Sequence, residues 1–131
     1  MIVGLGVELV DSARFAALVE RFGERLLGRL FTAGERAYAG RKARGGAESL
    51  AVRFAAKAAA RRALGLSRLA WQEAEVVRES GRAPTLRFHG AAHRRAGALG
   101  VRAVSLTLTH DPRWCVGQVV LEGGAPGRGG A

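Results

Sequence analysis

A row of cationic side chains lies in the stretch from Glu48 to Gly65, ESLAVRFAAKAAARRALG. Arg53, Lys57 and Arg61 follow one another at intervals of four, so on a helix they share one face, and Arg62 lies beside them. Guanidinium and ammonium groups gathered in this way can bind anions such as phosphates. Rows of this kind are also common on ordinary solvated surfaces, so the pattern alone leaves both interpretations open.

Other patterns typical of catalytic or metal sites are weak. His89 and His93 have the spacing of a helical metal pair, but His89 is expected in a strand and no third ligand is near. Cys115 is the single cysteine and lies in an apolar run, as expected for a small buried side chain. No Ser-His-Asp or Cys-His arrangement is evident. Thiol redox chemistry, zinc binding and a catalytic triad are therefore not expected.

The formal net charge of +10 points to an acidic partner. Most of the excess lies between Arg21 and Arg62, where eleven Lys or Arg residues face three Glu residues. A basic nucleic-acid-binding module is one alternative. Such a module needs aromatic side chains among its cations, and residues 32–62 contain only Tyr38 and Phe54, so we do not expect nucleic acid as the partner.

The cations must be positioned by the stretch in which they lie. Its apolar periodicity and its lack of proline predict one helix from about Ser49 to Leu64, with Gly65 at its end. Four alanines at intervals of four form a seam that lets a neighbouring element approach closely: Ala51, Ala55, Ala59 and Ala63. One face of this helix should then pack while another presents the cations.

The N-terminal third predicts a strand followed by two helices. Ile2–Val10 is aliphatic with interleaved glycines, which suits a strand against which another element packs closely. Residues 11–12 can cap a helix that Gly23 closes. Thr32 and Glu35 form a T-x-x-E capping box at the start of a second, short helix.

The remaining sequence predicts a β-rich C-terminal half. The order of elements indicates an α+β fold, a single small domain with a mainly antiparallel sheet wrapped around the central helix. We expect this domain to span residues 1–122 and the Gly-rich residues 123–131 to form a flexible tail. No apolar run approaches the ~20 residues of a membrane span, so a cytoplasmic protein without membrane association is expected. The predicted strands are Trp71–Arg78, Thr85–His89, Val101–Thr109 and Trp114–Glu122, with a helix at Gly90–Leu99.

Four segments together carry a family resemblance. RFAAK at residues 53–57 opens a helical run that ends in LG, and it is accompanied in order by GLGVELV at 4–10, LFTAGE at 30–35 and TLTH leading into WCVGQVVLE at 107–122. This set resembles the small bacterial holo-[acyl-carrier-protein] synthases of the 4′-phosphopantetheinyl transferase superfamily. The resemblance covers the chain up to Glu122 and implies a 4′-phosphopantetheinyl transferase-like fold.

The resemblance implies a reaction. In it, 4′-phosphopantetheine passes from coenzyme A to a serine of an acidic apo acyl carrier protein, 3′,5′-ADP is released, and fatty acid biosynthesis is supported. Phosphoryl chemistry of this kind needs the partners held in line and the phosphate charge neutralised. Mg²⁺ is the implied cofactor, and a homotrimer with sites between subunits is the implied assembly.

The resemblance also assigns residues. Glu8 matches an acidic metal ligand, and Arg14 and Arg21 match basic positions that bind the carrier protein. The implied catalytic set is Glu8, Arg62 and His110. The implied coenzyme A ligands are Arg53, Lys57, Arg62 and His110.

One position departs from the family pattern. Ala58 stands where an acidic metal ligand is expected, so Mg²⁺ would take more of its ligands from the pyrophosphate and water. An inactive homologue that still binds coenzyme A is therefore a second alternative. The basic loop at residues 41–46 is either a solvated linker or a further contact to the adenosine phosphates.

Overall fold

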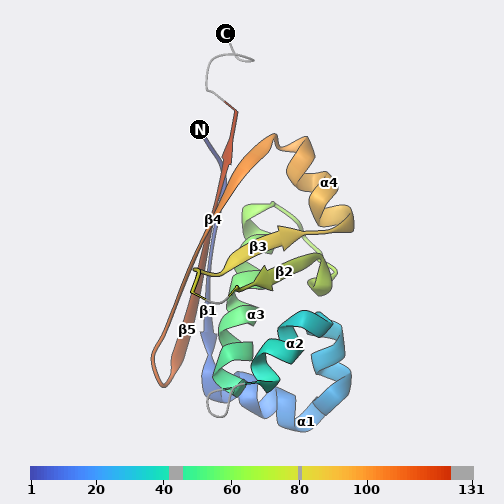
Figure 1. Cartoon of the computed structure of the whole chain (residues 1–131), viewed down its shortest axis with the longest axis vertical. Coiled ribbons are helices and arrows are strands. Elements are labelled where there is room, and N and C mark those ends of the chain that lie inside the picture. The colour runs from blue at the N-terminus through green and yellow to red at the C-terminus, as the bar shows by residue number, and fades with distance from the viewer. Residues whose placement is uncertain (42–45, 80, 125–131) are drawn as a thin grey trace.

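Helix α3 (Gly46–Ala63) runs through the middle of the computed structural model, which describes residues 1–41, 46–79 and 81–124 (Figure 1). The order of elements is the predicted one. Around α3 lie β1 (Ile2–Asp11), α1 (Ser12–Leu30), α2 (Ala33–Gly40), the 3₁₀ turn η1 (Trp71–Glu73), β2 (Ala74–Val77), β3 (Thr85–Phe88), α4 (Gly90–Ala98), β4 (Val101–His110) and β5 (Trp114–Gly123).

The strands form two antiparallel sheets that both pack on α3. One has three strands in the order β1-β5-β4, and the other is the hairpin β2-β3. Figure 1 shows α3 between the three-stranded sheet on one side and helices α1, α2 and α4 on the other. The predicted α+β architecture around a central helix is confirmed, with two sheets where one was expected.

Close contact between α3 and the sheet depends on a seam of small residues. The predicted alanines are all buried, and their backbone lies against glycines of β1 and β5. A Cβ added at Gly4 or Gly6 would overlap the carbonyl oxygen of Ala63 or Ala59. Larger side chains on either side would push the helix away from the sheet.

Helix α1 is longer than predicted. Asp11 caps it as expected, because its carboxylate accepts hydrogen bonds from the backbone N–H groups of Ala13 and Arg14. Gly23 breaks the helical geometry with a φ of +57°, but the chain resumes the helix as far as Leu30. Leu30 and its apolar neighbours pack into the core beside Phe15, so tertiary packing continues the helix beyond the glycine.

Other boundaries also differ from prediction. Trp71 opens a short 3₁₀ turn, and the strand begins only at Ala74. His110 is the last residue of β4, one residue beyond the predicted strand. The tail at residues 125–131 lies outside the described residues, and the domain division at residue 122 stays a prediction.

Within the described ranges, no helix has both the length and the apolar character needed to cross a bilayer.

Apolar side chains remain exposed on the outer face of β1. Side chains alternate along a strand, so one face of β1 meets α3 and the other does not. The exposed members are Leu5, Val7 and Leu9, at 56%, 51% and 57% exposure. A row of this size suggests that another molecule covers this face.

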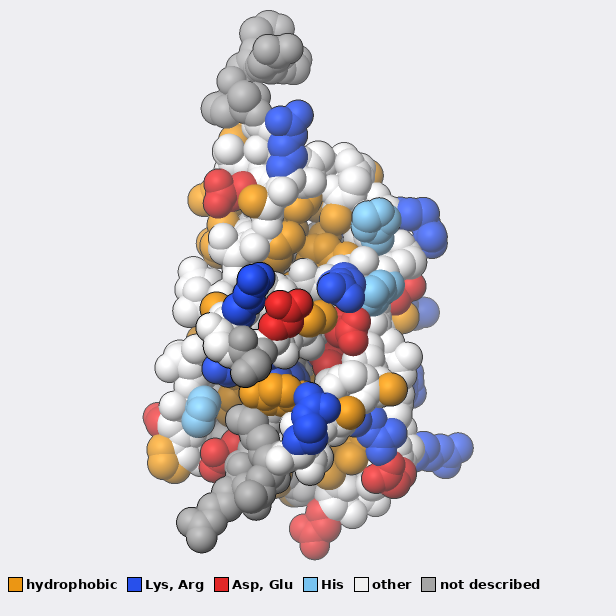
Figure 2. Space-filling model, viewed as in Figure 1, with side chains coloured by type: hydrophobic (Ala, Val, Ile, Leu, Met, Phe, Trp, Pro, Cys, Tyr) orange, Lys and Arg blue, Asp and Glu red, His pale blue; other side chains and the backbone are white. Residues whose placement is uncertain are grey.

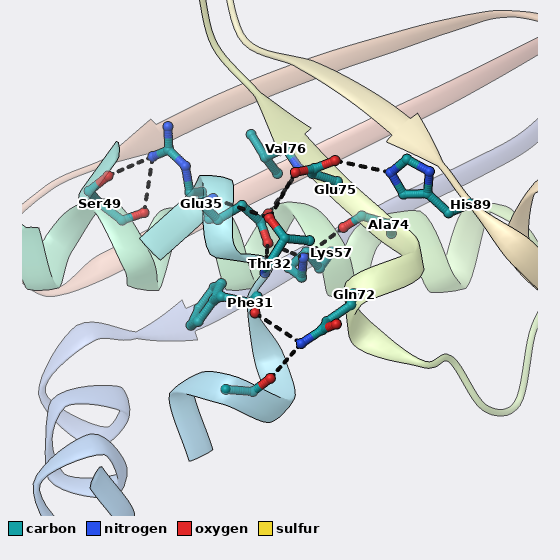
Figure 3. A network of polar contacts seen from close by, with 12 residues as sticks. Phe31, Thr32, Glu35, Ser49, Lys57, Gln72, Ala74, Glu75, Val76 and His89 are labelled. Atoms are coloured by element: carbon teal, nitrogen blue, oxygen red, sulfur yellow. Dashed lines mark hydrogen bonds and ion pairs between the residues drawn. The ribbon is translucent and has the colours of Figure 1, made fainter. Parts of the chain in front are cut away.

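A buried ion pair joins α3 to α2 and β2 (Figure 3). The ammonium of Lys57 donates to Glu35 Oε1 at 2.6 Å and to the carbonyl oxygen of Ala74 at 2.8 Å. The same carboxylate accepts from the backbone N–H groups of Thr32 and Val76, both at 2.9 Å. Glu35 therefore completes the predicted capping box and also neutralises a buried cation.

The cationic row does not form a solvent-facing surface, which corrects the prediction from helical spacing. Lys57 is completely buried and Arg53 is 5% exposed, because elements pack on every side of α3 at this level. Burial lowers the pKa of Lys57, although the charge of Glu35 opposes the shift.

We expect Glu35→Gln to lower the free energy of unfolding by roughly 3–5 kcal/mol, because it leaves the Lys57 ammonium buried without its counter-charge. The difference in free energy of unfolding between the variant and wild type should shrink as pH rises. Loss of the Glu35 charge lowers the pKa of Lys57 further, so the folded variant binds fewer protons than its unfolded chain and gains stability with pH. Urea unfolding at several pH values measures both effects.

Glu79→Gln provides the control, since that carboxylate is 68% exposed and pairs only weakly with Arg82. Its stability should stay within about 0.5 kcal/mol of wild type. A Glu35→Gln variant as stable as Glu79→Gln would show that the buried pair does not hold α2 on α3.

Candidate active site

Arg53 is held at the edge of the core by α2 and α3. Its Nη1 donates to Ser49 Oγ at 2.6 Å, and its guanidinium lies over the Tyr38 ring, 4.3 Å from the centroid. Burial lowers the pKa of Arg53, against the opposing effects of Tyr38 and Glu35. Its buried Nε has no hydrogen-bond partner in the part of the chain that the structure describes.

A cavity of about 580 Å³ opens beside Arg53, between α3 and β4. Three basic side chains line it, those of Arg53, Arg78 and His110, together with Thr107 and Glu48. The cavity therefore offers cationic groups and a hydroxyl to a ligand that carries phosphates. Arg53 and His110 were both predicted as ligands of coenzyme A, and the structure places them in this one cavity.

The turn after β4 fixes the position of His110. Asp111 Oδ1 accepts from the backbone N–H groups of Arg113 at 2.8 Å and Trp114 at 2.6 Å. These two hydrogen bonds lower the pKa of Asp111, so the turn is stabilised by a carboxylate that stays ionised.

Glu8 and Arg62 form an ion pair on the other side of α3. Glu8 lies on the same face of β1 as Gly4 and Gly6, which is the face that meets the helix. Its Oε1 accepts from Nε of Arg62, and the two side chains are 19% and 58% exposed. Among the described residues, the terminal nitrogens of Arg62 have no hydrogen-bond partner, so they remain available to a ligand.

A second cavity, of about 330 Å³, lies next to this pair. Glu8 lines it together with Asp11, Arg14, Phe54 and Trp114. This cavity connects the ion pair with the start of α1, where Arg14 and Arg21 are both exposed. Both arginines precede the break at Gly23, as the prediction of a basic docking side on α1 requires.

The predicted site residues fall into two groups within one chain. Arg53 and His110 belong to the cavity at β4, whereas Glu8 and Arg62 belong to the region at β1. Because β5 lies between β1 and β4 in the sheet, the two groups lie at opposite edges. Lys57 belongs to neither group, because its ammonium is fully used inside the core.

The donors at Glu8 do not fit a protein-bound magnesium ion. Mg²⁺ prefers several oxygen ligands, and position 58 contributes only a buried methyl group. Of the two carboxylates that line the neighbouring cavity, Glu8 already pairs with Arg62 and Asp11 caps α1. Across residues 1–41, 46–79 and 81–124, no group of three His, Cys, Asp or Glu side chains could hold a metal ion.

Two contributors were not predicted from the sequence. Arg78 lines the cavity at β4 although it follows β2 by one residue, and Tyr38 stacks under Arg53 from α2. A basic residue at the end of a predicted strand and an aromatic in a short helix were the only local signals. The predicted contact from the loop at residues 41–46 involves positions 42–45, which lie outside the described residues.

Basic side chains are not gathered into a continuous stripe on the face shown in Figure 2. Lys and Arg side chains spread over its height, with acidic and apolar side chains between them. A nucleic-acid backbone is usually met by a continuous basic surface. This face gives no support to the alternative of a nucleic-acid-binding module.

Comparisons with known proteins agree with the resemblance. The family model of the 4′-phosphopantetheinyl transferase superfamily matches residues 4–115. The holo-[acyl-carrier-protein] synthase of Koribacter versatilis is 42% identical over 125 residues, which cover 93% of this chain and 99% of that protein.

Two solved structures have the same fold. The crystal structure of the holo-[acyl-carrier-protein] synthase from Neisseria meningitidis has a TM-score of 0.84 at 26% identity, covering 93% of this chain and 99% of that one. The Bacillus anthracis holo-(acyl-carrier-protein) synthase, solved in complex with CoA (3′,5′-ADP), has a TM-score of 0.75 at 29% identity and covers 95% of this chain and 99% of that one. The family match, the near-complete coverage and the shared fold show that this chain belongs to the 4′-phosphopantetheinyl transferase superfamily.

Proposed function

We propose that the protein transfers 4′-phosphopantetheine from coenzyme A to a serine of apo acyl carrier protein, as a holo-[acyl-carrier-protein] synthase. The observation that carries this is the cavity at β4, which the basic side chains of Arg53, Arg78 and His110 line together. The cytoplasm as location and a role in fatty acid biosynthesis are predictions that go with this activity.

The reaction is an in-line displacement at phosphorus. The serine Oγ attacks the phosphorus that bears pantetheine and forms a new P–O bond. The bond from that phosphorus to the bridging oxygen breaks, 3′,5′-ADP leaves with the electron pair, and the hydroxyl proton passes to solvent. The protein's task is to orient the partners and to stabilise charge on the phosphate oxygens.

The cationic groups supply that stabilisation. We assign the phosphates of coenzyme A to Arg53, Arg78 and His110 at one end and to Arg62 at the other. Lys57 was predicted as a further ligand, but its ammonium already has two partners in the core, so we assign it the structural role of holding α2 and β2 on α3. Mg²⁺, the cofactor implied by the resemblance, has no fitting donor set among the described residues.

The activity is tested by incubating the protein with apo acyl carrier protein and coenzyme A, with and without Mg²⁺. Mass spectrometry should show a carrier heavier by one phosphopantetheine group, together with 3′,5′-ADP. Arg53→Met should weaken coenzyme A binding by about ten- to a hundredfold, since a charge-assisted contact is lost. Arg94→Met, on the exposed side of α4, is the control. Coenzyme A binding without transfer would favour the inactive homologue.

The carrier protein should dock on α1. Replacing both Arg14 and Arg21 by Glu puts like charges against an acidic carrier, so the KM for the carrier should rise at least about tenfold while coenzyme A affinity stays near wild type. Steady-state kinetics measures the KM for the carrier, and calorimetry measures the affinity for coenzyme A. A variant that loses coenzyme A affinity and keeps its carrier KM would move the docking site away from α1.

A complete site is assembled between copies of the chain, in the trimer that the family resemblance implies. Within one chain the two groups of site residues lie at opposite sheet edges, so the β1 edge of one copy must meet the β4 edge of the next. A head-to-tail contact of this kind gives a closed ring when the rotation between copies is that of the trimer. The exposed apolar row on β1 offers the surface that such a contact would cover.

Complementation tests this assembly. One chain carries Glu8→Ala and Arg62→Ala, and the other carries Arg53→Met and His110→Ala. Each should be nearly inactive alone, whereas equal co-expression should restore about a quarter of the sites, because that fraction combines the two intact edges at random. If oligomers shown to contain both variant chains remain inactive, both groups of residues belong to a site within one chain.

A further inference from the structure

We propose that Arg62, held by Glu8, takes the place of the divalent cation at the pyrophosphate, so that transfer proceeds without a protein-bound metal. This inference rests on the proposed function and concerns how the same reaction is stabilised. It follows from the disagreement between the donors at Glu8 and the needs of a magnesium site.

The negative charge of Glu8 already has a cationic partner. The carboxylate is neutralised by the guanidinium of Arg62. A divalent cation that used Glu8 would have to displace Arg62 and would then face its positive charge at short range. Position 58, one helical turn before Arg62, offers a buried methyl group and no oxygen.

The Glu8–Arg62 ion pair leaves part of the guanidinium open to a ligand. Glu8 accepts from Nε, which is the nitrogen nearest the Arg62 stem. One N–H of a terminal nitrogen shares that edge of the planar group, and the other three terminal N–H donors point away from it. The Arg62 side chain is 58% exposed, so a ligand can reach those donors. A planar guanidinium can bind two oxygens of a pyrophosphate at once, which a compact ammonium does less well.

The Glu8–Arg62 ion pair lies close to the surface of α1 proposed to bind the carrier protein. Glu8 lines the cavity that also contains Arg14, so Arg62 stands beside the region where the carrier serine would arrive. A fixed cation there can stabilise the charge that develops on the transferred phosphoryl group, as preorganised arginines do in other phosphoryl transfers. Arg62 is thus a catalytic residue and Glu8 a positioning residue.

The experiment compares transfer in excess EDTA with transfer in millimolar Mg²⁺, and repeats the comparison for coenzyme A affinity by calorimetry. Wild type should keep turnover within about twofold in EDTA, and Arg62→Ala should lose about a hundred- to a thousandfold of the metal-free rate. Arg61→Ala, the neighbouring arginine whose contact is to the carbonyl oxygen of Ser67, is the matched control and should stay near wild type. A wild-type rate that falls at least about tenfold in EDTA and returns with Mg²⁺ overturns the proposal.

The positioning role of Glu8 is tested by moving its carboxylate. Glu8→Ala should lower the metal-free kcat with little change in the KM for coenzyme A, because Arg62 is still present but no longer oriented. Adding Ala58→Glu to that variant puts a carboxylate one turn before Arg62, and it should restore the rate in EDTA. Restoration only with Mg²⁺ would show a metal ligand instead and would overturn the assignment.

Failure of the proposed function looks different. If no transfer occurs with or without Mg²⁺, calorimetry decides the inference by itself. Coenzyme A affinity that is equal in EDTA and in Mg²⁺, and at least about tenfold weaker in Arg62→Ala, supports it. Affinity that requires Mg²⁺ in wild type overturns it.

Discussion

The close approach of α3 to β1 and β5 is the constraint on which the other features depend. It is possible only because alanine meets glycine along the seam, with Gly117 of β5 continuing the contact towards Ala55. Backbone against backbone leaves α3 no room to rotate or slide. The register of the helix therefore fixes where Arg53 and Arg62 emerge, nine residues apart on different sides of the helix.

Burial of α3 on nearly all sides determines how its cations are used. A lysine in the middle of such a helix can be accommodated only with a counter-charge, which α2 supplies through Glu35. Arg53 and Arg62 lie on other sides of the helix, where one can reach the cavity beside β4 and the other the region beside β1. The separation of the two groups of site residues is thus a result of packing around one helix.

Much of the fold follows from local sequence signals. The alanine seam, the glycines of β1 and the Thr32–Glu35 capping box predicted close packing and the order of elements, because each depends on a few neighbouring residues. The extension of α1 beyond Gly23 and the burial of Lys57 were not predictable in this way, since both depend on side chains distant in sequence. Helical spacing placed Arg53, Lys57 and Arg61 on one face but could not show what that face meets.

The burial of RFAAK changes what a match to this stretch signifies. Every residue of that segment except the half-buried Phe54 is buried, and its lysine serves the interior. The segment therefore belongs to the packed interior, and finding it in a sequence is evidence about the architecture. Ala58, the next residue, is buried as well, at 5% exposure, and carries no charge. A chain can therefore keep the segment RFAAK intact and still carry a side chain without a carboxylate at the next position, as Ala58 illustrates here.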